Sequence, residues 1–540
     1  MLKKLKIGIL VNSQFVKKYE YEILEKLQNS NFCDIELIIE KANSNSLDKS
    51  FYIKHFLYLV YKKIDQFLFN RRINYLKQIS IKEFTNSIDK LSVEVNQKKY
   101  FDYFKDDDIS KIKEYKLDVI LRFGFNILKS DILQVANYGI WSFHHANNNI
   151  NRGGPPAFWE VMNKNLKTGV ILQRLNDDLD NGFIIDRTWT MTDSASVFRN
   201  LNIISWKSHI IMIRNLEKLY NNRDIFFNIE AKELSFYSHP LYMLPTNKEM
   251  ILNSIGILSN YIKLFNSKFL DNKRWHIRYK ENINKSFEMS LFRYKTLKAP
   301  SKDLFWADPF VIDKDNISFL FFEEYNYSLK KGHLSVMEYD LKTKSFLTPK
   351  IIIDEKYHLS YPFIFEKDSE YYIIPESHEN KTIDLYKCIK FPYCWKKEKT
   401  LLGDIIAVDT TPFFYNNKWW IFTNVIKEQD FPHHDDMYLY YCDDILNDKW
   451  ISHPKNPIVS DVSNARCAGK IFEYNGDIYR PSQNCEGHYG KSININKIVI
   501  FNEFEYKEKK IDEITSDFDD DLDSIHTFNF SKNMSVVDGK

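Results

Sequence analysis

Cysteine is sparse in this sequence, and its spacing excludes two common small-domain architectures. The 540 residues contain six cysteines, and no two of them form a Cys-x-x-Cys pair. Zinc ribbons and disulfide-stapled domains both depend on closely spaced cysteines, so neither is indicated. Reduced cysteines in a cytosolic protein are the simpler interpretation, and we expect a cytoplasmic location.

The sequence also lacks a large net charge and a long apolar run. Its 75 basic and 73 acidic residues leave a formal charge of +2, which argues against a nucleic-acid-binding protein. No stretch approaches the roughly 18 uninterrupted apolar residues of a membrane-spanning helix. The apolar start at residues 6–11 ends at Asn12, which favours a first β-strand over a signal peptide. We therefore expect a soluble protein with at most peripheral membrane contact.

Aromatic residues are abundant instead, at 16% of the chain, and indicate a globular protein. The length predicts two to four domains. Strands at 6–11 and 34–39 flank a helical pattern at 19–28, and further strands follow at 118–124 and 140–143. This order is typical of a doubly wound, Rossmann-like α/β domain, which a helix over 196–220 would close.

An insertion of about residues 45–110 interrupts the α/β pattern. Within it, residues 51–77 are aromatic and basic with helix-like spacing. Such a helix could lie on a membrane surface, or it could pack on its own domain. We favour packing on the domain.

A polar loop after the strand at 140–143 carries an ordered set of motifs. His144 is followed by Arg152-Gly153, Pro156, Thr168-Gly169-Val170 and Leu179-Asp180-x-Gly182. This order resembles the 10-formyltetrahydrofolate-dependent formyltransferases, whose pattern is Asn-x-His-x-Ser, Arg-Gly-x-x-Pro, Thr-Gly-Val and Leu-Asp-x-Gly. The chain departs from that pattern at two positions, with Ser142 in place of the family's Asn and Ala146 in place of its Ser.

The resemblance implies catalytic roles for three residues. His144 would act as base or oxyanion partner, Asp180 as its carboxylate, and Ser142 would stand where the family has its Asn. A Ser hydroxyl offers one donor on a short stem, whereas an Asn amide offers two. Three explanations stay open: Ser142 donates through its hydroxyl, Asn147 or Asn148 supplies the amide, or the domain has changed its chemistry.

The same resemblance implies a site for 10-formyltetrahydrofolate. The family binds it largely through a hydrophobic loop after a strand, and the matching residues here are Phe123, Gly124, Phe125, Ile127 and Leu128. Packing in a core would explain these apolar residues equally well.

Residues 221–290 lack a motif and are interpreted as a connector, and the hydrophobic period changes after them. Short aromatic and β-branched runs separated by polar turns indicate an all-β region. Pro309, Pro362 and Pro412 are 53 and 50 residues apart, and Gly469 and His526 follow at intervals of 57. A period of about 50 residues repeated five times predicts a five-bladed β-propeller over 291–540.

This half resembles the five-bladed propellers of family 43 glycosidases, and more closely the propeller region of plant glucosamine inositolphosphorylceramide transferases. The similarity is carried by WADPF at 306–310, IHTF at 525–528 and VDG at 537–539. Each repeat would place a polar side chain at the start of a blade's inner strand, facing the central channel. The residues expected to bind a sugar or nucleotide-sugar are Asp308, Glu324, Glu376, Asp409, Arg466, Arg480 and His526.

Together these patterns predict a formyltransferase-like α/β domain at 1–220, a connector at 221–290 and an all-β propeller at 291–540. The expected function is N-formyl transfer from 10-formyltetrahydrofolate to an amino sugar in polysaccharide biosynthesis. Two alternatives are a propeller-based glycosyl-type transferase or glycoside hydrolase with a degenerate N-terminal domain, and a non-catalytic carbohydrate-binding protein. Residues 431–436 could ligate a cation, but a polar loop is favoured and no metal is expected. The sugar acceptor and the formation of a homo-oligomer are left open.

Overall fold

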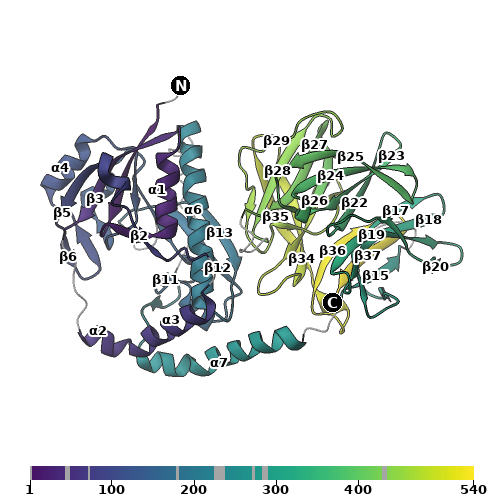
Figure 1. The fold of residues 1–540 in the computed structure, drawn as a ribbon, viewed down its shortest axis with the longest axis horizontal. Coiled ribbons are helices and arrows are strands. Elements are labelled where there is room, and N and C mark those ends of the chain that lie inside the picture. The colour runs from purple at the N-terminus through teal and green to yellow at the C-terminus, as the bar shows by residue number, and fades with distance from the viewer. Residues whose placement is uncertain are drawn as a thin grey trace. The chain divides into compact units, whose positions relative to one another are not determined.

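The computed structural model describes residues 3–42, 49–70, 73–177, 182–223, 237–270, 274–282, 290–427 and 434–540. The chain divides into two compact units, Met1–Lys268 and Phe269–Lys540, each with hydrophobic clusters of its own (Figure 1). None of the helices in the described residues has the length and apolar content to cross a membrane.

A seven-stranded sheet forms the centre of unit 1. The strands lie in the order β13 (Phe183–Met191), β12 (Lys167–Arg174), β10 (Ile140–His144), β8 (Val119–Arg122), β1 (Leu5–Val11), β3 (Cys33–Lys41) and β5 (Asp89–Val93). The five strands from β10 to β5 are parallel, whereas β12 is antiparallel to both of its neighbours. Runs of buried Ile, Leu and Val explain the parallel part, because its strands are covered on both faces. The predicted α/β class of the N-terminal half is confirmed.

Helices lie on both sides of this sheet. Figure 1 shows α4 (Asp106–Glu114) on one side and α1 (Lys18–Gln28) with α6 (Val197–Asn221) on the other, and α1 and α6 contact each other. The helix expected at 196–220 begins at a capped end. The Ser196 hydroxyl accepts a hydrogen bond from the Arg199 backbone N–H at 3.1 Å.

The insertion at about 45–110 begins with two α-helices, and most of its later elements are short strands. Its elements are α2 (Lys49–Lys54), α3 (Phe56–Phe69), β4 (Gln78–Ser80), β5, β6 (Asn96–Lys98) and β7 (Phe101–Tyr103). The helix expected over 51–77 ends earlier, because Asn70 leaves helical geometry. β5 extends the main sheet beside β3, and β7 pairs with β9 (Ile127–Lys129), so the insertion belongs to the α/β core.

The segment expected to be a connector contributes elements to both units. In unit 1, β14 (Leu241–Tyr242) pairs with β11 (Arg152–Gly153), and α7 (Asn247–Leu270) follows. In unit 2, β15 (His276–Glu281) pairs with β37 (Met534–Gly539). Two short elements complete unit 1, β2 (Phe15–Lys17) beside β4 and α5 (Phe158–Met162).

Unit 2 consists of five antiparallel sheets within the described residues. The first sheet contains β17 (Leu304–Lys314), β18 (Ile317–Asn326), β19 (Lys331–Asp340), β20 (Ser345–Phe346) and β21 (Lys350–Ile353). The second contains β22 (Ser360–Lys367), β23 (Glu370–Glu376), β24 (Thr382–Lys390) and β25 (Cys394–Gly403). The third contains β26 (Ala407–Tyr415), β27 (Lys418–Val425), β28 (Asp436–Cys442), β29 (Ile451–Ser452) and β30 (Val459–Ser460).

The last two sheets differ in where their strands come from. The fourth contains β31 (Arg466–Cys467), β32 (Phe472–Tyr474), β33 (Asp477–Asn484), β34 (Ser492–Phe501) and β35 (Tyr506–Ile514). The fifth combines β36 (Ile525–Phe530) and β37 with β15 and β16 (Lys295–Leu297), which precede the first sheet in the sequence. β17 contacts both β22 and β36, so the first sheet neighbours the second and the fifth.

A β-bulge recurs in a strand at one end of four of these sheets, in β17, β22, β26 and β36. The bulges fall after Ala307, Ser360, Val408 and Ile525. The next residues are Asp308, Tyr361, Asp409 and His526, and the first three have φ between 44° and 50°. A bulge re-aims the side chain that it carries, so these four side chains are turned out of the regular alternation. Pro309 and Pro362 sit within the bulge, whereas Thr410 takes that place in the third sheet and Pro412 lies two residues later.

Candidate functional site

In unit 1, β10 brings the predicted histidine to the carboxyl end of the parallel strands. Ser142 and His144 are two residues apart and share one face of the strand. The Ser142 hydroxyl accepts a hydrogen bond from Arg122 Nη1 at 2.7 Å, and Arg122 also donates to the Phe125 carbonyl at 3.2 Å. A guanidinium group therefore lies beside the position at which the family has its amide. Arg122 had no sequence signal beyond its place at the end of a strand.

The hydrogen bonds of His144 define its neutral form. His144 is buried, and its Nε2 lies 3.0 Å from the carbonyl oxygen of Asn151. Because a carbonyl only accepts, the proton of the neutral ring is on Nε2 and the lone pair is on Nδ1. The Asn151 side chain donates to Glu160 Oε1 at 2.9 Å, and burial raises the pKa of Glu160. The Asn151 carbonyl thus selects the tautomer of the neutral His144 ring.

His145 belongs to a different environment from its neighbour. Its Nε2 lies 2.9 Å from the Ser208 hydroxyl, and its ring packs edge-on against Tyr19. Burial lowers the pKa of His145 to about 3. His145 is therefore a neutral packing residue.

Asn148 is the better placed of the two amides considered as substitutes for the family's Asn. It is buried, and its Nδ2 lies 3.5 Å from Oε1 of Gln173, the cross-strand partner of Ser142. Asn148 Oδ1 has no hydrogen-bond partner among the described atoms. Asn147 instead accepts from the Asn149 backbone N–H at 2.9 Å and so closes its own turn. An amide with unused hydrogen-bonding capacity therefore lies against the strands that carry Ser142.

Asp180 and Leu179 lie outside the described residues, so the pairing of His144 with Asp180 stays a prediction. The adjacent Gly182 approaches β12 closely. A Cβ at this position would meet the Arg174 carbonyl oxygen at 2.4 Å, so only glycine fits there without a shift.

Packing accounts for two other motifs of the formyltransferase-like pattern. A Cβ on Gly169 would lie 1.9 Å from the Trp189 ring, and Thr168 Oγ1 lies 2.8 Å from Thr192 Oγ1. Gly153 has φ of 101°, and a Cβ there would meet the Tyr242 carbonyl at 2.1 Å. These positions shape the sheet and the loop that surround His144.

The loop expected to bind 10-formyltetrahydrofolate divides into packed and accessible residues. Phe125 and Leu128 are buried in the core of unit 1, and a Cβ on Gly124 would lie 2.5 Å from the Asn12 backbone nitrogen. Phe123 and Ile127 are half-buried. A folate ring would find these two apolar side chains and the backbone between them, and the residues present fit that use.

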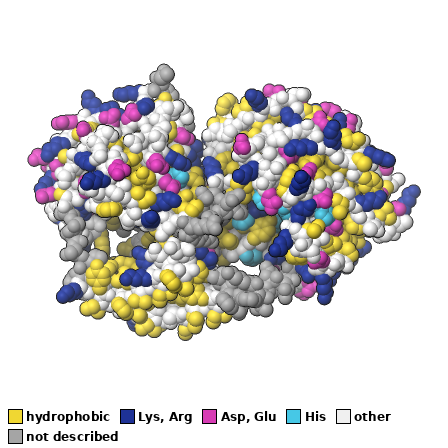
Figure 2. Space-filling view, in the orientation of Figure 1, with side chains coloured by type: hydrophobic (Ala, Val, Ile, Leu, Met, Phe, Trp, Pro, Cys, Tyr) yellow, Lys and Arg dark blue, Asp and Glu magenta, His cyan; other side chains and the backbone are white. Residues whose placement is uncertain are grey.

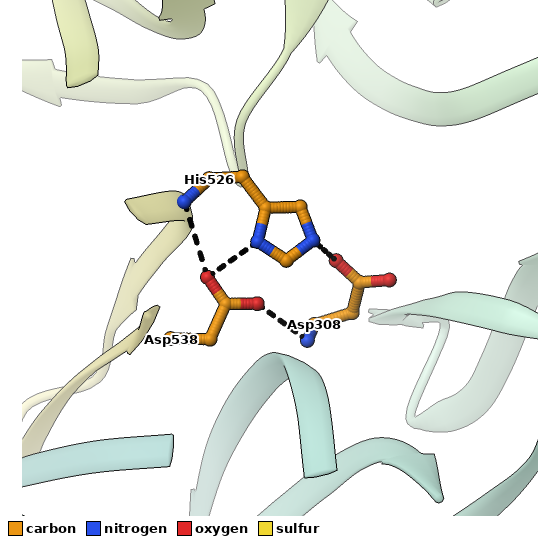
Figure 3. Close-up of side chains that lie close together, drawn as sticks. All are labelled: Asp308, His526 and Asp538. Atoms are coloured by element: carbon orange, nitrogen blue, oxygen red, sulfur yellow. Dashed lines mark hydrogen bonds and ion pairs between the residues drawn. The ribbon is translucent and has the colours of Figure 1, made fainter. Parts of the chain in front are cut away.

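In unit 2, the bulges bring a histidine and two aspartates together (Figure 3). His526 Nε2 lies 3.2 Å from Asp308 Oδ1, and His526 Nδ1 lies 2.8 Å from Asp538 Oδ1. Burial alone would lower the pKa of His526, but Asp538 and Asp308 raise it to about 10. Burial opposes ionisation of Asp308, yet His526 and Thr527 hold its pKa below the usual range. The arrangement is a buried imidazolium between two carboxylates.

The same three residues have the composition of a cation site. The ligand atoms of Asp308, His526 and Asp538 all lie within 4.8 Å of one another. A histidine ligand must be neutral and must offer a lone pair, whereas both nitrogens of His526 face carboxylate oxygens. The ion pair explains the cluster without a metal.

Of the predicted polar loop at 431–436, residues 431–433 lie outside the described residues.

A second group of charges lies in the second to fourth sheets. Arg466 Nε donates to Asp409 Oδ2 at 2.5 Å, and the Asp409 backbone N–H donates to Glu376 Oε2 at 3.2 Å. Burial works against the charged form of Glu376, but His378 and Arg466 lower its pKa to about 2. Burial, together with Glu376 and Asp308, raises the pKa of Asp409 to about 7 although Arg466 donates to it. Two neighbouring carboxyl groups thus differ widely in proton affinity.

Glu323 adds a third buried carboxyl group with a high proton affinity. Burial and the nearby charge of Asp308 raise its pKa well above the usual range. His358 Nε2 lies 3.6 Å from Glu323 Oε1, and burial lowers the pKa of His358. Burial thus favours the protonated form of Glu323 and the neutral form of His358, beside Asp308.

Half-buried aromatic rings border these charges. Trp275 lies 4.1 Å from the His526 ring between centroids, and Tyr489 lies 5.3 Å from it. The Arg466 guanidinium stands over Tyr489 at 4.9 Å and its Nη1 lies 2.8 Å from His434 Nδ1. Rings and charged groups side by side are a common way to bind a sugar, with its apolar face on the ring and its hydroxyls on the polar groups.

Of the seven residues predicted for unit 2, the structure brings five together: Asp308, Glu376, Asp409, Arg466 and His526. Glu324 instead accepts from Trp306 Nε1 at 2.7 Å and pairs with His333 at 2.9 Å. Arg480 forms two hydrogen bonds with Glu508, at 2.8 and 2.7 Å. Both are engaged in buried pairs within their own sheets.

Several members of the unit 2 cluster were not predicted. They are Trp275, Glu323, His358, His378, His434, Tyr489, Asp538 and Gln483, whose Nε2 donates to Asp409 Oδ2 at 2.9 Å. The VDG element at 537–539 marked the neighbourhood of Asp538, and His434 lies in the polar loop at 431–436, but the others fall outside the repeated element and had no sequence signal.

The two parts of the chain are similar to different known proteins. Residues 294–532 match the family described as "Glucosamine inositolphosphorylceramide transferase 1, N-terminal". The protein named Glucosamine inositolphosphorylceramide transferase 1 from Oryza sativa subsp. japonica is 35% identical over 206 residues, which are 38% of this chain and 27% of that protein. Its namesake from Arabidopsis thaliana is 32% identical over 209 residues, with the same coverage of 38% and 27%. The chain thus spans about a quarter of the length of these plant relatives.

The N-terminal part has relatives of another kind. Methionyl-tRNA formyltransferase from Prochlorococcus marinus (strain NATL2A) is 29% identical over 122 residues, 22% of this chain and 36% of that protein. Both resemblances drawn from the motifs, to formyltransferases and to the plant transferases, are confirmed at this level.

Solved structures with low sequence identity also resemble parts of the chain. Glycinamide ribonucleotide transformylase 1 from Symbiobacterium toebii has a TM-score of 0.30 at 12% identity and covers 41% of this chain and 89% of its own. Zg3597, a family 117 glycoside hydrolase from Zobellia galactanivorans, has a TM-score of 0.34 at 10% identity and covers 48% of this chain and 89% of its own.

Proposed function

We propose that this protein is an N-formyltransferase that moves a formyl group from 10-formyltetrahydrofolate to the amine of a sugar. The observation that carries the proposal is the environment of His144. This buried histidine is held by the Asn151 carbonyl, it shares a strand face with Ser142, and Arg122 and Asn148 adjoin that face. Formyl transfer needs a group that removes the amine proton and donors for a developing oxyanion.

The residues of the loop would divide these tasks. His144 Nδ1 would accept the proton from the attacking amine, while the Asn151 carbonyl holds Nε2 and so keeps the ring in the right tautomer. Arg122 and the Asn148 amide would donate to the negative charge, with the Ser142 hydroxyl anchored by Arg122. Asp180 would complete the set as the carboxylate that stabilises the imidazolium formed when His144 takes the proton. Ser142 in place of Asn is then compensated by a guanidinium and a neighbouring amide.

10-Formyltetrahydrofolate would supply the electrophilic formyl carbon when bound. Phe123 and Ile127 would contact its ring, and Gly124 would let the loop lie close to the end of β1. Phe125 and Leu128 would support that loop from the core.

In unit 2, we propose that the five sheets are the blades of a β-propeller and that the charged cluster binds the sugar. The order of the sheets, the repeated bulges and the pairing of β15 with β37 support this arrangement. Trp275 and Tyr489 would stack on the sugar ring. Asp308 and Arg466 would meet its hydroxyl groups or a linked phosphate. Glu324 and Arg480 would support the sheets.

The test is incubation of the purified protein with 10-formyltetrahydrofolate and a panel of nucleotide-linked amino sugars. We expect a product heavier than the acceptor by one CO group, detected by mass spectrometry. A protein that binds these sugars without turnover would refute the enzyme assignment and favour a carbohydrate-binding protein.

A second function, glycosyl-type transfer or hydrolysis in unit 2, is favoured by one observation. Glu376 and Asp409 have pKa values near 2 and 7, and such divergence is typical of carboxyl groups that share acid and base roles. Sugar released or moved from an activated glycoside, without any gain of CO, would support this function over formyl transfer. An Asp409→Asn variant should then lose that activity.

A further inference from the structure

Helix α3 of unit 1 presents apolar side chains to solvent. Phe56, Val60, Ile64 and Phe67 recur at intervals of three or four residues and so lie on one side of the helix. All four are exposed, and Phe67 is 84% exposed. Water-facing helix sides normally carry polar residues, so an apolar stripe here indicates a surface that something covers.

The opposite side of α3 is already occupied. Tyr58 and Tyr61 stack edge-on against Phe158, with ring centroids 5.4 and 6.2 Å apart. Asp65 is buried and accepts a hydrogen bond from the Phe198 backbone N–H at 2.6 Å. The prediction that this helix packs on its own domain holds for that side, and it leaves the apolar stripe unexplained.

Helix α7 adds a second stripe of the same kind. Ile251, Ile255, Leu258 and Ile262 recur with helical spacing, and each is at least half exposed. Ile255 is 80% exposed. Figure 2 shows apolar side chains gathered over this part of unit 1.

The two helices are held side by side at both ends. The Asn247 side chain accepts from the Leu57 backbone N–H at 3.0 Å and donates to the Ile53 carbonyl at 2.8 Å. Further along, the rings of Phe69 and Tyr261 lie 5.8 Å apart. The stripes of α3 and α7 therefore form one surface, called here the apolar face.

The charges near the apolar face have one sign. Among the described side chains of α2, α3 and α7, the exposed charged residues are Lys49, Lys54, Lys62, Lys63 and Lys248. The two acidic residues of these helices are engaged elsewhere, since Asp65 is buried and Glu249 accepts from the Thr246 backbone N–H at 2.7 Å. Apolar residues bordered by lysines fit an anionic, apolar partner better than a copy of the same lysine-bearing surface, which would repel it.

We propose that the apolar face seats unit 1 on the surface of an anionic phospholipid membrane. The side chains of Phe67 and Ile255 would enter the boundary between headgroups and acyl chains, and the lysines would lie at the phosphates. This surface lies on the side of α3 that faces away from Phe158 and the helix that carries Glu160. Membrane binding therefore needs none of the residues assigned to formyl transfer.

The experiment is flotation of the full chain with vesicles of phosphatidylcholine, with and without phosphatidylglycerol. We expect the protein to float with the anionic vesicles and to float less with the neutral ones. The double variant Phe67→Glu, Ile255→Glu should lose at least roughly tenfold in the bound fraction. The matched control is Phe504→Glu, a ring 77% exposed in unit 2, which should float like the wild type.

A second variant tests how much the lysine charges contribute to vesicle binding. Lys54→Gln, Lys62→Gln and Lys63→Gln combined should reduce binding to the anionic vesicles and leave binding to the neutral ones unchanged. Circular dichroism and the melting temperature show that each variant is folded. No flotation of the wild type, or unchanged flotation of the double glutamate variant, would overturn the proposal. Light scattering provides a further test. A dimer that the glutamate substitutions dissociate, together with no vesicle binding, would mean that a second copy of the chain, and not a membrane, covers the apolar face.

Discussion

The polar clusters of the two units differ in their charge and in how far their polar atoms are hydrogen-bonded. Around His144 the groups are mostly neutral, and Asn148 retains hydrogen-bonding capacity that no described atom uses. Around Asp308 and Asp409 charged groups form ion pairs, two of them between sheets, Asp308 with His526 and Asp409 with Arg466. A cluster with unused hydrogen-bonding capacity is suited to a group that changes during a reaction. A cluster of mutually satisfied charges is suited to holding a shape and a ligand.

The largest expected effect is on the unit 1 cluster. His144→Ala should reduce formyl transfer by about 10²–10⁴-fold, because the proton acceptor is lost. Initial rates with the best amino-sugar acceptor measure this. The control is His145→Asn, which alters the neighbouring packing histidine and should leave the rate within a few-fold. Equal loss in both variants would mean that the strand, and not the imidazole, was disturbed.

The next effect tests whether the charges of unit 2 depend on one another. Arg466→Met removes the cation that faces Asp409 and Glu376, and breaking a buried pair costs about 3–5 kcal/mol. Denaturant unfolding measures the loss, and a second change, Asp409→Asn, should recover part of it. Lys497→Met breaks a partly exposed pair with Asp477 in the same unit and should barely change stability. If Arg466→Met changed the free energy of unfolding as little as Lys497→Met, the stability of unit 2 would not depend on these buried charges.

A third pair of substitutions tests which amide near Ser142 donates to the oxyanion. Asn148→Ala should lower the turnover rate by about 10²–10³-fold, the usual effect of losing an oxyanion donor. Asn147→Ala removes the turn-closing amide and should have a smaller effect. A larger loss from Asn147→Ala would reverse the assignment, and no loss from either would leave Arg122 as the donor.

The smallest effect concerns pH. In the folded protein the pKa of His526 is about 10, against an ordinary value near 6.5, so its stabilising contribution is complete below pH 6.5 and is lost as the pH rises through 10. Between pH 7 and 9 this should cost unit 2 about 2–3 kcal/mol. His526→Gln should remove most of that slope in denaturant unfolding. A variant with the wild-type slope would show that Asp308 and Asp538 do not hold a charged imidazole.

Much of the fold could be predicted because its periodicities are local. The buried strands of unit 1, the helix after Ser196 and the all-β character of the C-terminal half follow from spacing along the chain. The period of unit 2 was also visible, although Pro412 misplaces the third repeat by two residues. The structural repeat is the bulge at Asp308, Tyr361 and Asp409, which depends on pairing with the next strand and not on proline.

The sites were only partly predictable, since they join residues that are distant in sequence. His144 follows from its motif, but Arg122 reaches Ser142 only because β8 and β10 are neighbours in the sheet. Asp538 faces His526 because their strands pair around a bulge. The direction of the stripe on α3 could not be predicted either, because the same helical spacing describes an apolar side that faces the core and one that faces outward.

The pairing of β15 with β37 has a consequence for synthesis on the ribosome. Ile277 lies opposite Asp538, so the fifth sheet stays incomplete until nearly the whole of unit 2 has been made. β15 meanwhile exposes the edge that β37 later covers, and an unpaired edge makes a nascent chain prone to associate with its neighbours. Chaperone demand during translation should therefore fall only when the last strand emerges.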